Sequence, residues 1–109
     1  MKYAEPKTRI GLSDGSCDEM GVHFHAENYE GARGYHGDED TAYFNADLYR
    51  NGELVKTDEL VTCTVNFGTC IAEVEDFAEA GDTVKVVVHA DPAKPDYDQE
   101  DAVLEFEVA

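Results

Sequence analysis

Cations, cysteines and serines are scarce in this chain, and each shortage excludes a class of function. Eight lysines and arginines stand against 25 aspartates and glutamates in 109 residues, so no large positive patch is available for a nucleic-acid backbone. Three cysteines are too few for a disulfide framework. Serine occurs only at Ser13 and Ser16, neither within the Gly-x-Ser-x-Gly turn of a hydrolase. No glycine-rich loop leads into a helix, so we predict neither an enzyme nor a phosphate-cradling site.

Long apolar runs are also missing. No stretch approaches the roughly 20 residues of a membrane span, and the start, Met1–Pro6, lacks the apolar core of a signal peptide. We therefore expect no membrane span and no export by the ordinary secretory route. The length and the apolar content predict one domain over residues 1–109 with a single core.

The acidic residues are the most informative component that is present. The formal net charge is −17, and the acids are dispersed from Glu5 to Glu107 rather than gathered in a tail. Molar salt shortens the Debye length to about 3 Å and removes most of the resulting self-repulsion. The composition is therefore typical of a protein adapted to a highly saline environment.

Apolar residues alternate with polar ones along most of the chain, which predicts strands with one buried and one solvated face. The inward-facing sets are Met20, Val22, Phe24 and Ala26; Phe44, Ala46 and Leu48; Val61, Cys63 and Val65; Cys70, Ala72 and Val74; Val84, Val86 and Val88; and Leu104, Phe106 and Val108. Asn51-Gly52 predicts a tight hairpin into a short strand at 53–56. With a weaker strand at 8–12, the sequence predicts an all-β, antiparallel sandwich of seven or eight strands.

The remaining segments are predicted to be loops. The longest are 28–40 and 91–101, and a polar loop at 13–19 holds an unpaired Cys17. One helical turn is expected at 76–79.

Two stretches resemble immunoglobulin-like, cell-adhesion-type modules. The first is the hairpin Phe44–Val55 around Asn51-Gly52, and the second is Ala80–Val88 followed by Ala90-Asp91-Pro92 and the closing strand Val103–Val108. The Cys…Trp…Cys pattern and the tyrosine corner of antibody domains are absent. The resemblance implies an immunoglobulin-like sandwich that serves adhesion, spacing or assembly, and it transfers no catalytic residues.

Two histidines on one strand face are candidate metal ligands. His23 and His25 would lie about 6–7 Å apart on the solvated face of one strand, a spacing that suits a transition metal. Further ligands from the adjoining loop would be His36, Asp38 and Asp40. The alternative is that both histidines are ordinary exposed strand residues.

A second candidate cation site is the acidic loop 91–101, where Asp96 and Asp98 are candidate ligands for Ca²⁺ or another divalent cation. The loop lacks the glycine of an EF-hand, and Pro92 and Pro95 stiffen it. A solvated acidic loop is the alternative, and a chain without any cofactor is the simplest expectation.

Cys63 and Cys70 flank a hairpin turn and belong to inward-facing sets, which places them opposite each other within bonding range. The sequence leaves open whether they form a structural disulfide or remain reduced core thiols.

Some apolar and aromatic residues fall on the predicted solvated faces, where contiguous patches mark interaction sites. Tyr43 and Tyr49 are opposite the inward set of their strand. The other interface candidates are Leu60, Ile71, Val87 and Val103. The alternative is that the long loop 28–40 covers this face.

Three functional hypotheses follow. The first is a non-enzymatic structural protein that binds other subunits of a homo- or hetero-oligomeric assembly, as a capsid decoration, tail or spike component in the virion of a virus with a halophilic host. The second is an acidic cytoplasmic binding protein of a halophilic cell, in its sharpest form a nucleic-acid mimic that inhibits a basic partner. A cupredoxin-like metal carrier is the third, although no cysteine–histidine cluster lies near the end of the sequence.

Overall fold

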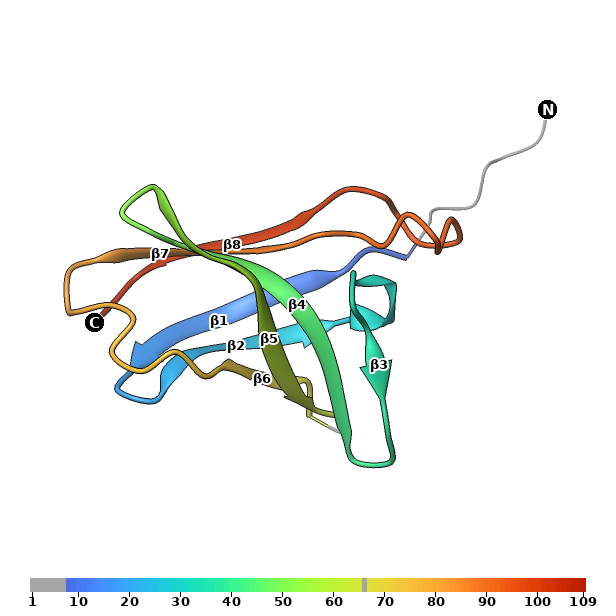
Figure 1. The fold of residues 1–109 in the computed structure, drawn as a ribbon, viewed down its shortest axis with the longest axis horizontal. Helices are drawn as coiled ribbons and strands as arrows, with labels where there is room; N and C mark the ends of the chain where they lie inside the picture. The colour runs from blue at the N-terminus through green and yellow to red at the C-terminus, as the bar shows by residue number, and fades with distance from the viewer. Residues whose placement is uncertain (1–7, 66) are drawn as a thin grey trace.

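The computed structural model describes residues 8–65 and 67–109, in which the strands form one antiparallel sheet (Figure 1). The strands are β1 (Gly11–Asp18), β2 (Gly21–Glu27), β3 (His36–Gly37), β4 (Thr41–Arg50), β5 (Glu53–Thr64), β6 (Thr69–Ala72), β7 (Thr83–Val88) and β8 (Ala102–Glu107), with a short 3₁₀ turn, η1 (Tyr29–Gly31), after β2. Their hydrogen-bonded order is β1-β2-β6-β5-β4-β7-β8, and β3 pairs with β4.

Strand β4 turns this sheet into a coil. Its whole length pairs with β5, while its second half, from Asp47 to Arg50, also pairs with β7. The β4–β5 ribbon therefore crosses from the β1-β2-β6 layer to the β7-β8 layer (Figure 1). Strands β1 and β8 end the order and lie against each other, because Gly15 leaves room for the Phe106 ring where any Cβ would collide with it.

The predicted all-β, antiparallel class is confirmed. One continuous sheet forms a nearly closed barrel, and a division into the two sheets of an immunoglobulin-like sandwich is not established.

The core follows the predicted alternation. Phe24, Leu48 and Val86 are buried as expected. The Phe44 ring lies between Phe24, at 6.4 Å between centroids, and Tyr29, at 5.8 Å, an arrangement that adds aromatic contacts to area burial. Phe106 is only partly buried, since it packs where the two end strands meet.

The first strand was predicted in the wrong place. Instead of a strand at 8–12 and a polar loop at 13–19, β1 spans Gly11–Asp18, so Cys17 lies in a strand. The register against β2 shifts between Ser13 and Ser16, and Asp14 has φ 56°. Such a bulge inserts an extra residue and breaks the period of two on which the prediction depended.

Four other expectations were wrong at strand ends and turns. Met20 lies in the β1–β2 turn and is 58% exposed, and Val65 follows the end of β5 and is 40% exposed. The segment 76–79 is not helical; instead Phe77 is buried, and Arg50 Nη1 donates to its carbonyl at 2.9 Å. The short strand at 53–56 is the first part of the long β5.

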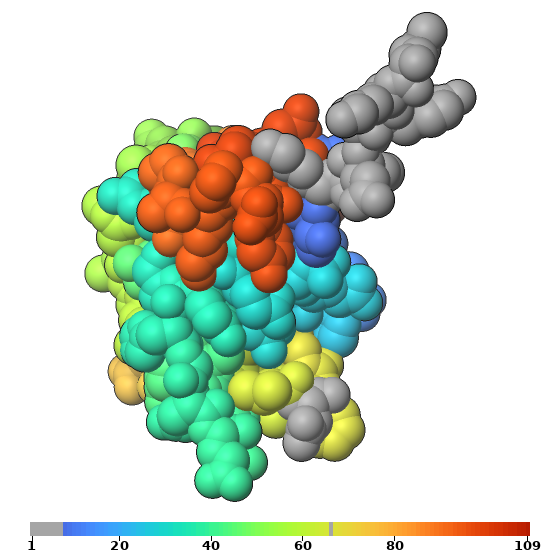
Figure 2. Space-filling model, turned by 90° about the vertical axis from the view of Figure 1, so that its right-hand side faces the viewer, coloured from blue at the N-terminus to red at the C-terminus, as the bar shows by residue number. Residues whose placement is uncertain are grey.

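The loop between β7 and β8 covers the segment around η1. Asp91 N–H donates to the Gly31 carbonyl at 2.9 Å, and the Tyr97 ring lies against Gly31. Figure 2 shows this loop, in orange and red, resting on the cyan residues of that segment.

Candidate functional site

The outer face of β1, β2, β6, β5 and β4 carries an unusual set of side chains, which we call the neutral face. Strand pairing arranges them in two rows that run across the sheet. One row is Ser16, His23, Ile71, Thr62 and Tyr43, and the other is Ser13, His25, Thr69, Thr64 and Thr41. Leu60 lies one pair beyond Thr62 on the same strand face and is 51% exposed.

None of the residues of the neutral face is Asp, Glu, Lys or Arg, although 25 of the 109 residues of the chain are acidic. Their inward neighbours, such as Val61, Phe24 and Ala72, are buried, which fixes the opposite face as the outer one. Carboxylates reappear at the margin, on Asp14 in the bulge of β1 and on Asp18, Glu27 and Glu73, which are all exposed. The face therefore has a neutral centre and an acidic rim.

Three of the six predicted interface residues lie on this face. Tyr43 and Ile71 are half-buried, and Tyr43 stacks on His36 with ring centroids 4.8 Å apart. The loop 28–40 reaches this face along β4, where His36 of β3 stacks on Tyr43 and Asp38 N–H donates to the Thr41 carbonyl at 2.9 Å. Leu60 is the third and most exposed of them.

The other three predicted residues lie elsewhere. Tyr49 packs beneath Lys85, whose Nζ is 4.2 Å from the ring centroid, and Val103 on β8 is 57% exposed. Val87 is buried, so its predicted exposure was wrong. It pairs with Asp47 on one side and Val103 on the other, at a position where the sheet bends between layers.

Sequence reasoning missed a second cluster, which we call the His89 clamp. His89 Nε2 lies 2.8 Å from Asp47 Oδ2, and Nδ1 lies 2.9 Å from Asp101 Oδ2. An ionised carboxylate only accepts hydrogen bonds, so both ring nitrogens donate and the imidazole is a cation. Asp47 is buried, and its other oxygen accepts from Thr57 Oγ1 at 3.1 Å and Asp58 N–H at 2.9 Å.

These contacts set the pKa values in the clamp. The hydrogen bond that His89 donates to Asp47 is the main cause that raises the pKa of His89, and Asp101 adds to it against the opposing effect of burial. Burial alone would raise the pKa of Asp47. The hydrogen bonds from His89, Asp58 and Thr57 together outweigh burial and lower it. The clamp ties β4, β5 and the loop after β7 together.

The predicted metal ligands do not come together. His23 Nε2 lies 2.9 Å from Asp18 Oδ1, a hydrogen bond that, with one from Met20 N–H, lowers the pKa of Asp18. His25 Nε2 lies 3.8 Å from Glu27. Within residues 8–65 and 67–109, no group of three or more His, Cys, Asp or Glu side chains is arranged to hold a metal ion.

The remaining candidate ligands lie in loops or at the sheet margin. Asp98 Oδ2 faces Arg9 Nε at 3.4 Å, while Asp96 is exposed in the same loop. His36 is engaged with Tyr43, and Asp38 and Asp40 belong to the turn between β3 and β4.

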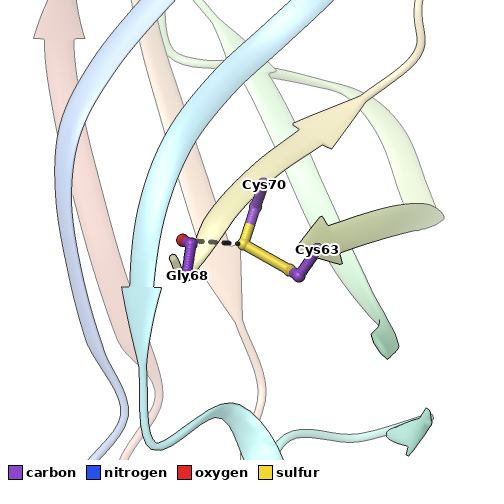
Figure 3. The surroundings of a disulfide bond; sticks show 3 residues. All are labelled: Cys63, Gly68 and Cys70. Carbon is purple, nitrogen blue, oxygen red and sulfur yellow. Dashed lines mark hydrogen bonds between the residues drawn. A yellow bond between two sulfur atoms is a disulfide. The ribbon is translucent and has the colours of Figure 1, made fainter. Parts of the chain in front are cut away.

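Cys63 and Cys70 form a disulfide that joins β5 to β6 (Figure 3). The two residues are directly paired, with Cα atoms 4.2 Å apart, and both are buried. Their neighbours on the outer side are Thr62, Thr64 and Thr69, so the bond lies immediately beneath the neutral face.

An open depression of about 420 Å³ adjoins this face at the end of β2. Its wall includes His25, Glu27, Glu30 and Phe67, and Phe67 is 72% exposed. The lining mixes carboxylates with one exposed aromatic ring and shows no converging set of catalytic groups.

No helix in the described part of the chain is both long and apolar enough to cross a membrane. Comparisons with protein-family models, with curated proteins and with solved structures find no match.

Proposed function

We propose that this chain is a non-catalytic structural subunit that works in concentrated salt and binds other protein subunits through its neutral face. The observation that carries the proposal is the partition of charge. An even distribution of 25 acids over 109 residues would place about two or three in a set of this size, and the face contains none.

The energetics of docking favour such a partition. A carboxylate that is buried in an interface without a partner loses its hydration at a cost of several kcal/mol. Interface centres are accordingly depleted of charged residues and enriched in aromatic ones, with a polar rim. Tyr43, Ile71 and Leu60 amid hydroxyl groups match such a centre, and Asp18 and Glu73 match the rim.

The remaining surface suits a highly saline solvent. The net charge of −17 keeps the subunit hydrated and disfavours nonspecific contacts. At molar salt the repulsion between copies is screened within about 3 Å, so specific contacts through a carboxylate-free surface become possible.

The setting that we propose is the virion of a virus that infects a halophilic host, where the chain would be a capsid decoration, tail or spike component. The acidic composition and the β architecture support this setting. The immunoglobulin-like, adhesion-type character inferred from the Phe44–Val55 hairpin belongs to the same proposal.

A pair of single-charge variants tests the function. Thr62→Asp places one carboxylate at the centre of the neutral face, and Val103→Asp places one on an exposed position of β8. Each tagged variant would be produced during infection of the source host, and its recovery in gradient-purified particles would be measured. We expect Thr62→Asp to be lost from the particles and Val103→Asp to be retained. Equal retention of both, or a wild type found only outside particles and bound to a basic partner, would refute the proposal.

A further inference from the structure

We infer that the neutral face binds the neutral face of a second copy of this chain, around a twofold axis. The inference rests on the proposed function and names one partner for the same surface. Three properties of the face support self-pairing: its hydrogen-bonding groups, its charge and its rigidity.

The polar groups of the face are able to pair with their own kind. Most are hydroxyls, on Ser13, Ser16, Thr41, Thr62, Thr64 and Thr69. A hydroxyl both donates and accepts, so a face of hydroxyls can satisfy an identical face. A face of carboxylates only accepts and a face of lysines only donates, so neither pairs with itself. In a twofold contact both copies use the same surface patch, so that patch must be complementary to itself. A face of hydroxyl groups is self-complementary in this sense.

The charge of the chain also favours a second copy over a basic partner. A basic protein would be attracted to the many carboxylates outside the neutral face, and this face offers it no opposite charge. A second copy of this acidic chain is instead repelled by every part of the surface that carries carboxylates. The neutral face is the part where that repulsion is weakest. The rim carboxylates, including Glu27 and Glu73, lie at the margin of such a contact, so association should strengthen as salt screens them.

The size of the face predicts a weak contact. Adjacent strands lie about 4.8 Å apart and the two rows about 6.7 Å apart, so the face spans roughly 20 Å by 15 Å with its margins. This area of about 300–400 Å² per copy is at most about half of what each partner buries in a standard interface. We therefore expect a dissociation constant in the high micromolar range or above, which suits a subunit whose contacts add up within an assembly.

The structure beneath the face limits the entropy lost on binding. Cys63 and Cys70 link the two central strands directly under Thr62, Thr64 and Thr69. Side chains on a cross-linked pair of strands need less ordering on association, so more of the contact energy appears as affinity.

Sedimentation equilibrium on the purified chain tests the inference. In molar KCl the wild type should show a monomer–dimer equilibrium at high micromolar concentration, and lowering the salt should weaken it. Thr62→Asp should raise the dissociation constant by about tenfold or more, whereas the matched Val103→Asp should leave it unchanged. A wild type that stays monomeric, or a dimer that is equally sensitive to both substitutions, would overturn the inference.

Cross-linking provides a second readout that does not depend on how a new charge affects folding. In a Cys17→Ser background, Thr62→Cys lies near the proposed axis and Val103→Cys lies far from it. Mild oxidation should trap a covalent dimer only through position 62. Absence of that dimer would again overturn self-pairing. The two proposals fail separately: a monomeric chain whose Thr62→Asp variant is still lost from particles retains the docking function but has a different partner.

Discussion

Replacing His89 by alanine should lower the stability of the fold and also change how that stability depends on pH. The substitution removes the cation that lies between Asp47 and Asp101. Asp47 would remain buried as an anion, with only Thr57 and the Asp58 N–H as hydrogen-bond partners. The loss therefore includes a charge-assisted hydrogen bond and part of the compensation for a buried charge.

The two arms of the clamp contribute unequally. The Asp47 side chain is 12% exposed, so its hydrogen bond with His89 should be worth about 1.5–3 kcal/mol. The Asp101 side chain is 46% exposed, and solvent screening limits that arm to less than about 1 kcal/mol. We expect His89→Ala to lower the free energy of unfolding by about 2–4 kcal/mol. For a domain of this size that corresponds to a fall of roughly 10–20 °C in the midpoint of thermal unfolding.

The pH dependence follows from the two shifts. His89 has a raised pKa in the fold, so its contribution is complete below the unfolded-state pKa of about 6.5 and is lost as pH rises through the folded-state value. Asp47 has a lowered pKa, so its contribution is complete above about 3.9 and is lost as pH falls through its folded value. The clamp is therefore strongest between about pH 4 and pH 6.5.

Urea unfolding in molar KCl, followed by circular dichroism across this range and into the alkaline region, measures the effect. The stability difference between wild type and His89→Ala should be largest in mildly acidic buffer and shrink as pH rises. His25→Ala, which removes a histidine whose Nε2 lies 3.8 Å from Glu27 Oε1, serves as the control and should lower the stability less. If the difference in unfolding free energy between wild type and His89→Ala is constant from acidic to alkaline pH, His89 does not act as the cation between Asp47 and Asp101.

Three further predictions use the same unfolding measurements. Dilution from molar to millimolar KCl should lower the midpoint because screening of the −17 charge is lost; a midpoint that is flat or rises would contradict salt adaptation. Preventing the Cys63–Cys70 bond with a double alanine variant should cost about 2–3 kcal/mol, as expected for a short closed loop, and an unchanged midpoint would exclude a stabilising bond. Gly15→Ala should cost about 1–3 kcal/mol because its Cβ would collide with the Phe106 ring. The control Gly11→Ala meets no atom closer than 3.9 Å and should change stability by less than about 0.5 kcal/mol; equal effects would refute that packing.

Regular alternation was the reliable signal in the sequence. Val84, Val86 and Val88, like Phe44 and Leu48, are buried where the period of two placed them. The same rule failed at the bulge of β1, where one extra residue at Asp14 reverses the predicted face, and at Val65, which lies beyond the end of β5. Phe77 stands in a segment without any period, so no pattern indicated its burial.

Neither candidate site was readable from spacing alone. Asp47 and His89 are 42 residues apart, and only the coiling of β4 onto β7 makes them neighbours. The neutral face required the strand order, since β6 lies between β2 and β5 although it follows both in the chain. The alternation of the sequence predicted that Tyr43, Leu60 and Ile71 lie on solvated strand faces. It did not predict that the three residues share one face.

The contact between β1 and β8 has a consequence for biosynthesis. Gly15 and Phe106 meet although most of the described chain separates them, and loop-closure entropy makes such distant pairings slow to form. A nascent chain can pair β1, β2, β5 and β6 early, yet the outer edge of β1, which has no hydrogen-bonded strand beside it, stays uncovered until β8 has left the ribosome and packs against it. During that interval the exposed edge is a template for pairing with other nascent chains. The bulge at Asp14 and the nearby carboxylate of Asp18 would then act as a safeguard during synthesis, when neighbouring polysome-bound copies are closest together.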